Sequence, residues 1–279
     1  MHLLPRLTAA LFGLIWGSFC NVLICRIPQS ESILGRSRCP QCKQTLKVVD
    51  LVPVLSYLIF KGRCRYCGNH ISPLYPVVEL LTAGIFVLLY HLFFTEPTLL
   101  VLNGFFLTCA LLVAFIDFRH MIIPNVVVVP ATAVSAASLL LQINPQGLEI
   151  AHGLLGAISG GGLFLAMWIF TCGAGMGMGD VKWAFFMGLT LGPIQLIPAL
   201  LIASFSGLLL AAVSLTVKKL RSAPGIQSDI SCQKDGRRFL GVKFIGGKPA
   251  VPFGTFLALG FSVMLLYGDT LLNWWLRIY

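Results

Sequence analysis

The sequence predicts an all-α, polytopic integral membrane protein with about eight transmembrane segments. Hydrophobic residues make up 57% of the 279 positions and charged residues 11%, less than half the roughly 25% usual for soluble domains. Apolar runs of about 20 residues recur along the chain, each long enough to cross a bilayer as a helix. The charged residues gather in two short windows between these runs. A soluble globule and a disordered chain are both excluded.

Seven apolar runs are long enough for membrane spans. They cover residues 7–25, 75–94, 98–116, 122–143, 150–172, 194–217 and 251–275. The first run continues without a small-residue cleavage site, so we expect an uncleaved first span. An eighth stretch, 181–191, is apolar except for Lys182 and is cut off by Gly192-Pro193, which ends a helix. We expect it to cross as a short, tilted or protein-buried helix.

The distribution of basic residues indicates that this short stretch crosses. The loops 26–74 and 218–249 each carry eight basic and two acidic residues, a net charge of +6. With eight spans, both loops lie on one side of the membrane. That side, loops included, then holds 18 of the 20 basic residues. Because cytoplasmic loops are enriched in Lys and Arg, that side is predicted to be the cytoplasm. The alternative, in which 181–191 does not cross, would place the two basic loops in opposite compartments.

These boundaries divide the chain into five parts. The first transmembrane segment is 1–25, a cytoplasmic loop follows at 26–74, membrane helices fill 75–217, a basic cytoplasmic loop covers 218–249, and the last transmembrane segment is 250–279.

Two paired cysteine motifs lie in the first loop. Cys39 and Cys42 form one C-x-x-C element, and Cys64 and Cys67 form the other, with 21 residues between them. This spacing is close to that of a four-thiolate zinc site. Two disulfides are the alternative interpretation, but disulfides seldom persist in the reducing cytoplasm. The loop is therefore predicted to be a small zinc-binding domain whose metal is structural, with iron as the main competitor.

Three carboxylates, Glu79, Asp117 and Asp180, adjoin or lie within apolar runs near the predicted cytoplasmic face. An ionisable group there is costly and is a functional candidate by default. Asp180 follows a run with four glycines in seven residues, 173–179, which another chain could approach closely. The alternative interpretation makes Asp180 a helix N-cap and Asp117 an interfacial side chain without chemistry.

Five motifs in order resemble the type IV prepilin leader peptidases, which are membrane aspartic proteases with a G-x-G-D signature. They are Gly17-Ser18-Phe19-Cys20-Asn21 with Arg26-Ile27-Pro28; the paired C-x-x-C loop with Tyr75-Pro76 through Glu79; Asp117 followed by Ile123-Pro124; Gly177-Met178-Gly179-Asp180; and Pro252-Phe253-Gly254. The resemblance extends over residues 11–266. It departs from the family at Leu74, where many members have arginine, at Asn125, where many have aspartate, and at Thr255, where proline usually follows.

The resemblance implies a bacterial inner-membrane enzyme, with its active site facing the cytoplasm, that cleaves the basic leader from type IV prepilins and pseudopilins. Asp117 and Asp180 would be its catalytic residues. Gly177 and Gly179 would lie along the substrate backbone, and Pro252, Phe253 and Gly254 would form the opposite wall of the site. The two aspartates could share one proton, since neighbouring carboxylates in a low dielectric resist double ionisation.

The resemblance also implies N-methylation of the new terminal amine, with S-adenosylmethionine as donor and the zinc-bearing loop assisting. Glu79 is the candidate for orienting a cationic group in that reaction, and its alternative role is that of a buried partner for Arg26 or another basic residue near the inner face. No dinucleotide-type glycine fingerprint is present. The two basic loops are expected to bind anionic lipid headgroups, and no nucleic acid partner is expected.

Two other function classes remain open. A proton-coupled transporter could use the three carboxylates as a relay, although deeper charged groups would then be expected. A thiol-redox or metal-handling membrane protein could use the cysteines, but it would leave the aspartates without a role.

Overall fold

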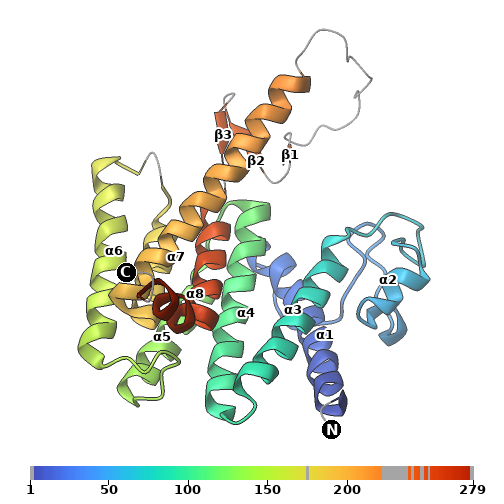
Figure 1. Ribbon diagram of the computed structural model, residues 1–279. Coiled ribbons are helices and arrows are strands. Elements are labelled where there is room, and N and C mark those ends of the chain that lie inside the picture. Colours follow the sequence, from blue (N-terminus) through green and yellow to red (C-terminus); the bar gives the residue numbers. More distant parts are fainter. Residues whose placement is uncertain are drawn as a thin grey trace. The chain divides into compact units, whose positions relative to one another are not determined.

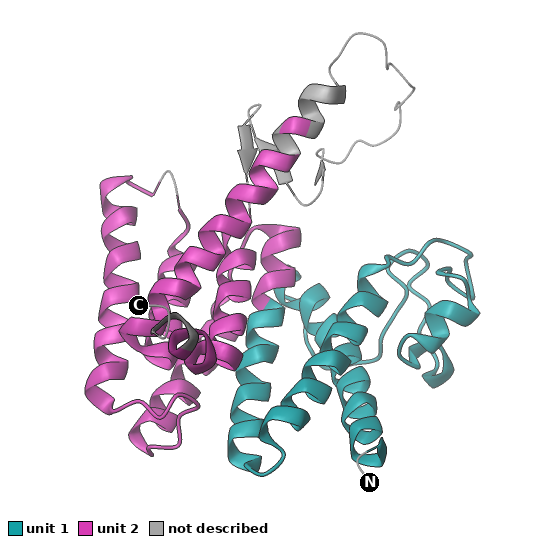
Figure 2. Cartoon of the chain, viewed as in Figure 1, with its two compact units in different colours: residues 1–112 teal, residues 113–279 magenta. Residues whose placement is uncertain are grey.

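The computed structural model (Figure 1) describes residues 3–173, 176–221, 238–239, 242–245, 248–250 and 252–276. Two compact units divide the chain, Met1–Leu112 and Val113–Tyr279 (Figure 2). Six described helices are long and apolar enough to cross a membrane. The prediction of an all-α polytopic membrane protein is therefore confirmed. The basic loop 218–249 departs from the all-α prediction, because a small antiparallel sheet lies in that region.

Unit 1 combines membrane helices with the cysteine-bearing loop. Its helices are α1 (Leu3–Arg26), α3 (Leu74–Phe93) and the first part of α4 (Pro97–His120). The loop holds two short 3-10 helices, η1 (Ile27–Gln29) and η2 (Val48–Leu51), and the one-turn helix α2 (Leu55–Ile59).

Helices α1 and α3 approach closely because glycines line their contact. A Cβ on Gly13 would lie 2.6 Å from Ala83 Cα, and one on Gly17 would lie 2.7 Å from Glu79 Cα. Near the loop end of the pair, Asn21 donates a hydrogen bond to the Tyr75 carbonyl oxygen at 3.0 Å. Small residues at a helix contact let backbones pack tightly in a membrane, where the hydrophobic effect does not drive association.

Unit 2 contains the end of α4 and four further helices. These are α5 (Asn125–Leu140), α6 (Ile150–Phe170), α7 (Met178–Arg221) and α8 (Phe253–Leu276). A three-stranded antiparallel sheet, β1 (Arg238–Phe239), β2 (Val242–Ile245) and β3 (Lys248–Ala250), precedes α8. Its registers pair Phe239 with Val242 and Phe244 with Pro249.

Helix α7 is two helices joined at Gly192, where the backbone is non-helical (φ 72°, ψ 173°). A Cβ on Gly160 would meet both the Ala184 carbonyl oxygen and the Leu196 side chain. In a straight helix residues 184 and 196 would be about 18 Å apart, so the chain folds back between them. The part before Gly192 is largely buried: Trp183, Ala184, Phe186 and Met187 are all 0% exposed. The predicted short, protein-buried helix ending at Gly192-Pro193 is therefore confirmed.

The two halves of α7 make their tightest glycine contacts with different helices, although Trp183 in the first half also packs on Phe261 of α8. The first half contacts α6, where Gly156 faces Gly188. The second half contacts α8, where a Cβ on Gly260 would meet the Ala199 carbonyl oxygen and Gly268 faces Gln195. Gly179 therefore lies at one end of unit 2 and Gly192 at the other, and the second half returns towards the first end.

Candidate functional site

Asp117 lies in the last turn of α4, and its position follows from how that helix ends. Met121 takes a left-handed conformation (φ 58°), and its N–H donates to the Asp117 carbonyl oxygen at 2.8 Å. Pro124, the residue before α5, has an extended backbone, and proline also disfavours helix in Ile123, the residue before it. The Asp117 side chain is 5% exposed.

The first turn of α8 supplies the hydrogen bonds to Asp117. The Thr255 N–H donates to Asp117 Oδ2 at 3.0 Å, and the Thr255 hydroxyl donates to the Ala114 carbonyl oxygen at 2.9 Å. The first N–H groups of a helix have no intrahelical acceptor and favour an anion there. A Cβ on Gly254 would lie 3.0 Å from Asp117 Oδ2. The close approach of the first turn of α8 to the carboxylate therefore requires glycine at position 254.

Asp180 lies in the first turn of α7. Its Oδ2 accepts a hydrogen bond from the Gly177 N–H at 3.2 Å, and its own N–H donates to the Gly177 carbonyl oxygen at 3.1 Å. The expected N-cap position for Asp180 is therefore wrong. The helix begins at Met178, which makes Asp180 its third residue, and a carboxylate there reaches back to the N–H of the capping residue.

Ile123 lies between the two aspartates. A Cβ on Gly254 would be 2.8 Å from Ile123 Cδ1, and one on Gly179 would be 2.8 Å from Ile123 Cβ. The residues next to Asp117 and Asp180 thus pack against the same side chain. Neither carboxylate forms an ion pair with a residue in the described ranges. The structure brings together two carboxylates that are 63 positions apart in the sequence.

The other predicted substrate-loop residues divide into two groups. Gly177 is exposed and borders only the Asp180 carboxylate, whereas Gly179 is covered by Ile123. Pro252 is buried, and the Phe253 ring stacks on Phe164 with centroids 6.2 Å apart. Of these residues, Gly177 contacts the Asp180 carboxylate and Gly254 contacts the Asp117 carboxylate.

Sequence reasoning assigned no role to Thr255, Ile123, Lys182 or Asn125. The Lys182 ammonium donates to Asn125 Oδ1 at 3.0 Å, which ties the start of α7 to the start of α5. The signal in the sequence was that Asn125 and Thr255 both depart from the residues usual in the family. Both make side-chain or backbone contacts at this site.

The four cysteines of the loop form one cluster. Their Sγ atoms all lie within 4.8 Å of one another, and Cys39 Sγ is 3.9 Å from Cys67 Sγ. A tetrahedron with metal–sulfur bonds of 2.3 Å has edges of about 3.8 Å. All four are free thiols in a single group, which contradicts the alternative of two disulfides and shows a cluster that could bind a metal.

Each pair of cysteines is folded by its own tight turn. The Lys43 N–H donates to the Cys39 carbonyl oxygen at 3.0 Å, and the Gly68 N–H donates to the Cys64 carbonyl oxygen at 2.9 Å. Lys43 and Gly68 both have positive φ. Each C-x-x-C element is therefore closed by a tight turn.

The thiols of the cluster differ in acidity. Burial raises the pKa of the Cys39 thiol, but the Cys42 and Gln41 amides and the neighbouring thiols outweigh it and lower that pKa to about 7. The Asn69 amide lowers the pKa of Cys67, while burial and hydrogen bonds from the other thiols raise it to about 11. The backbone amides of the first turn thus favour a thiolate at Cys39, the form in which cysteine binds metal.

Asp50 joins the second cysteine turn to η2. Its Oδ2 accepts hydrogen bonds from the Lys47 N–H at 2.9 Å and from the Tyr66 hydroxyl at 3.0 Å. The Arg65 guanidinium lies 3.8 Å from Asp50 Oδ1. Burial and the Asp50 carboxylate raise the pKa of Tyr66.

Glu79 is buried in α3, and it does not pair with Arg26. Its Oε2 accepts a hydrogen bond from the Val54 N–H at 2.8 Å, and the Ser18 and Asn21 side chains also hydrogen-bond to it. The Arg26 guanidinium instead donates to four loop carbonyls, those of Ser32, Ile33, Leu34 and Arg36. The alternative role of Glu79 as the partner of Arg26 is therefore wrong.

Comparisons with known proteins agree with this arrangement. Residues 11–93 match the Bacterial Peptidase A24 N-terminal domain, and residues 104–212 match the Type IV leader peptidase family. The chain is 32% identical to a prepilin leader peptidase/N-methyltransferase of Bacillus subtilis over 96% of both chains. A protein of the same name from Klebsiella pneumoniae is 36% identical over 70% of this chain and 88% of its own.

A Legionella pneumophila protein with that name is 28% identical over 97% of this chain and 94% of its own. No solved structure matches the chain. The matches cover nearly the whole chain, and the chain belongs to the type IV leader peptidase family.

Proposed function

We propose that this protein is a membrane aspartic endopeptidase that removes the basic leader from type IV prepilins and pseudopilins, with Asp117 and Asp180 as its catalytic residues. One observation carries the proposal: both carboxylates lie at the same end of unit 2, around Ile123, without an ion-pair partner among the described residues. The names of its relatives support the substrate class.

The carboxylates would act as a pair. The ionised member takes a proton from the attacking water, and the protonated member donates a hydrogen bond to the scissile carbonyl oxygen. The Thr255 and Gly177 N–H groups hold the two side chains in fixed orientations. The exposed backbone at Gly177 is the part of the glycine loop that a substrate chain could lie against. The dyad titrates as a unit, so neither proton is assigned to one residue.

Asparagine substitutions test the pair. Asp117→Asn and Asp180→Asn should each reduce cleavage of a prepilin peptide on the order of 10³-fold or more, the scale of a lost acid–base group. The double variant should be little worse than either single variant, because partners in one step are non-additive. The measurement is a cleavage assay in detergent at matched protein and metal content. Substantial turnover by either single variant would refute the aspartate mechanism.

The topology is proposed with eight crossings. The six long helices are joined by α5 and by the separate first half of α7, and the fold-back at Gly192 supports the eighth crossing. Both basic loops, 26–74 and 218–249, would then face the cytoplasm and anionic lipid headgroups. Much of the second loop lies outside the described residues. The protein would reside in the bacterial inner membrane with the aspartates facing the cytoplasm.

Zinc is the metal proposed for the cysteine cluster. The sulfur spacing fits a tetrahedral four-thiolate centre, and Cys39, Cys42, Cys64 and Cys67 would hold it. Such a centre has no open coordination position, so its role would be to fold the loop.

N-methylation of the cleaved product is proposed as the second activity, with S-adenosylmethionine as the methyl donor, as the names of the relatives suggest. The cavity in the cysteine-bearing loop, about 600 Å³ in volume, has Arg36 and Lys47 as its charged lining residues. Glu79 is already bound to Val54. Neither the basic lining of the cavity nor the Glu79 carboxylate fits the sulfonium cation of the donor. No step of the reaction is therefore assigned to the donor.

Glu79 remains a candidate for the methylation reaction, and two substitutions separate its charge from its hydrogen bond. Glu79→Gln keeps an acceptor for the Val54 N–H, whereas Glu79→Ala does not. Cleavage should be unchanged in Glu79→Gln, while methylation of the product, followed by mass spectrometry, should fall roughly tenfold if the charge orients the amine. Full methylation in Glu79→Gln with loss in Glu79→Ala would contradict a role for the charge.

A further inference from the structure

The segment 48–60 of the cysteine-bearing loop has an unusual composition for a loop outside a membrane. It carries one charged residue, Asp50, between Lys47 and Lys61. The Asp50 carboxylate accepts hydrogen bonds from the Lys47 N–H and the Tyr66 hydroxyl and forms an ion pair with Arg65. The Asp50 side chain is 6% exposed. The remaining surface of the segment is therefore almost free of charge.

Large apolar side chains of this segment are exposed. Val48 is 82% exposed, Leu58 is 65% exposed and Ile59 is 60% exposed, and Val49 and Leu55 are each more than half exposed. We call these five residues the apolar wedge. Several large exposed apolar side chains in one short segment indicate an interaction site.

The wedge lies alongside the membrane helices of unit 1. The Val54 N–H donates a hydrogen bond to the Glu79 carboxylate. Glu79 lies five residues after the first residue of α3, or about 7.5 Å along that helix. At the same level Gly17 contacts Glu79, and α1 continues to Arg26, about 13 Å further. The loop thus leaves α1 at its end and returns to a level inside the ends of both helices.

A strained turn at Val54 brings the loop to the level of Glu79 on α3. Val54 has φ 59° and ψ −47°, and the Leu55 N–H bonds to the Pro53 carbonyl oxygen, which together make a γ-turn. This turn is rare, and a β-branched residue at positive φ is an outlier. Such a conformation persists only where its surroundings hold it, and here the buried Glu79 carboxylate does so.

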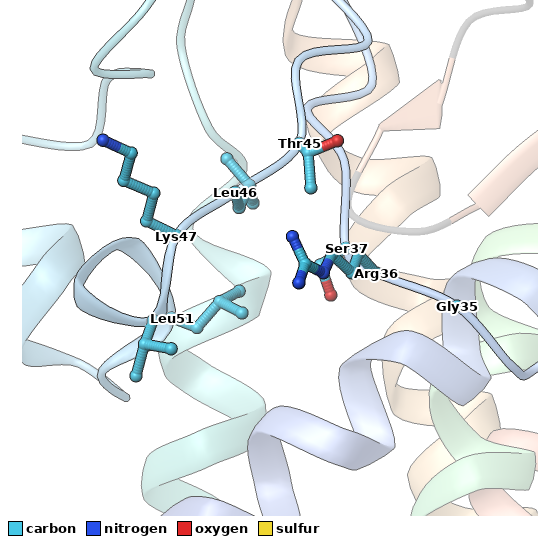
Figure 3. A pocket seen from close by; sticks show the side chains of 8 residues that line it. Gly35, Arg36, Ser37, Thr45, Leu46, Lys47 and Leu51 are labelled. Atoms are coloured by element: carbon cyan, nitrogen blue, oxygen red, sulfur yellow. The ribbon is translucent and has the colours of Figure 1, made fainter.

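The border of the wedge is basic. The cavity of about 600 Å³ is lined by Arg36 and Lys47 together with Leu46, Val48 and Leu51. In Figure 3 the Arg36 guanidinium points towards Leu46 and Leu51, whereas the Lys47 amine points away from them. Cations with apolar stems at the edge of an apolar surface match anionic headgroups above acyl chains.

We propose that the apolar wedge inserts into the bilayer leaflet beside α3, so that the cysteine cluster is held on the membrane surface at a fixed depth. A segment of this length cannot span the bilayer, but it can lie in the interface with its apolar side chains among the acyl chains. The Glu79–Val54 hydrogen bond sets the depth. This inference does not depend on the peptidase activity.

Photocrosslinking in lipid nanodiscs tests the proposal with the full-length protein and no other partner present. The photoreactive residue p-benzoylphenylalanine replaces Leu58 in the wedge or, as the matched control, the exposed Gln44 between the cysteine motifs. The discs contain phosphatidylethanolamine and phosphatidylglycerol, and phospholipid adducts are counted by mass spectrometry. Metal content confirms that each variant retains a folded cysteine cluster.

The expected result is a phospholipid adduct at Leu58 at roughly ten times the yield at Gln44, since only the wedge would lie among lipid chains. Equal yields at the two positions would overturn the proposal. So would the absence of lipid adducts at Leu58, including the case in which that position crosslinks only to its own chain or to a second copy.

Discussion

The two candidate sites of this protein are assembled in different ways. The cysteine cluster in unit 1 is built from two short turns, each of which places two thiols by hydrogen bonds within five residues. The aspartate site in unit 2 takes its parts from the end of α4, the start of α7 and the start of α8. The first site depends on local backbone conformation, and the second depends on how membrane helices pack.

This difference predicts where each site is vulnerable. A single ligand substitution should destroy the metal site and leave the helices of unit 2 inserted, because their insertion depends on the length of their apolar runs. A small change far from the aspartates should damage the second site if it moves the first half of α7. The glycine contact between α6 and α7 is the place where such a change is most severe.

Among changes outside the two aspartates, the largest effect is expected from Gly156→Ala. A Cβ at this position would clash with the Gly188 carbonyl oxygen and the Gly192 backbone, and neither is a flexible side chain. Overpacking of this kind costs about 1–3 kcal/mol. If α7 shifts by about 1 Å to relieve it, cleavage should fall roughly 100-fold. Thermal unfolding in detergent and the peptide-cleavage assay measure the two effects.

Gly162→Ala is the matched control on the same helix, since a Cβ there meets nothing within 4 Å. It should keep full activity and gain slightly in stability from the higher helix propensity of alanine. Similar behaviour of the two variants would show that the α6–α7 contact does not position Asp180.

A smaller effect on cleavage is expected from Cys64→Ser. The variant should lose most of the bound metal, because three thiolates cannot complete a four-thiolate structural site. Cleavage should fall less than threefold, roughly within the range of a surface change, if the two sites are independent. Metal analysis of purified protein and the cleavage assay decide this.

Cys172→Ser controls for the loss of a thiol as such, because Cys172 is a free cysteine outside the cluster. It should retain the metal and the activity. Loss of cleavage in Cys64→Ser in parallel with the metal would show that the loop supports the aspartate site, and the contrast between local and assembled sites would fail.

The same contrast explains what sequence reasoning achieved. The spacing of the cysteines predicted their cluster, because a C-x-x-C turn fixes both thiols locally. Gly192-Pro193 predicted the break in α7, because both residues act on the backbone at their own positions. The contacts of Glu79 with Val54 and of Asp117 with Thr255 were not predictable in this way. They join residues 25 and 138 positions apart, and only the packing of helices brings such residues together.

The backbone at Thr255 gives the most specific prediction for the aspartate site. Thr255→Pro removes the N–H that donates to Asp117 Oδ2. Proline is tolerated in the first turn of a helix, where the N–H makes no intrahelical bond, so α8 should still begin at Phe253. Cleavage should fall by a few-fold to about tenfold, equivalent to losing about 1 kcal/mol of orientation at the carboxylate.

Thr255→Ala is the variant that sharpens this result. It keeps the N–H and loses only the hydroxyl, which donates to the Ala114 carbonyl oxygen and lies 3.5 Å from Asp117 Oδ2. Its kcat/KM should therefore stay close to that of the unsubstituted protein, while Thr255→Pro is slower at the same pH. If Thr255→Ala is as slow as Thr255→Pro, the hydroxyl and not the helix N-terminus orients Asp117. If both are fully active, the hydrogen bond from α8 does not contribute to catalysis, and Asp117 is held by the end of α4 alone.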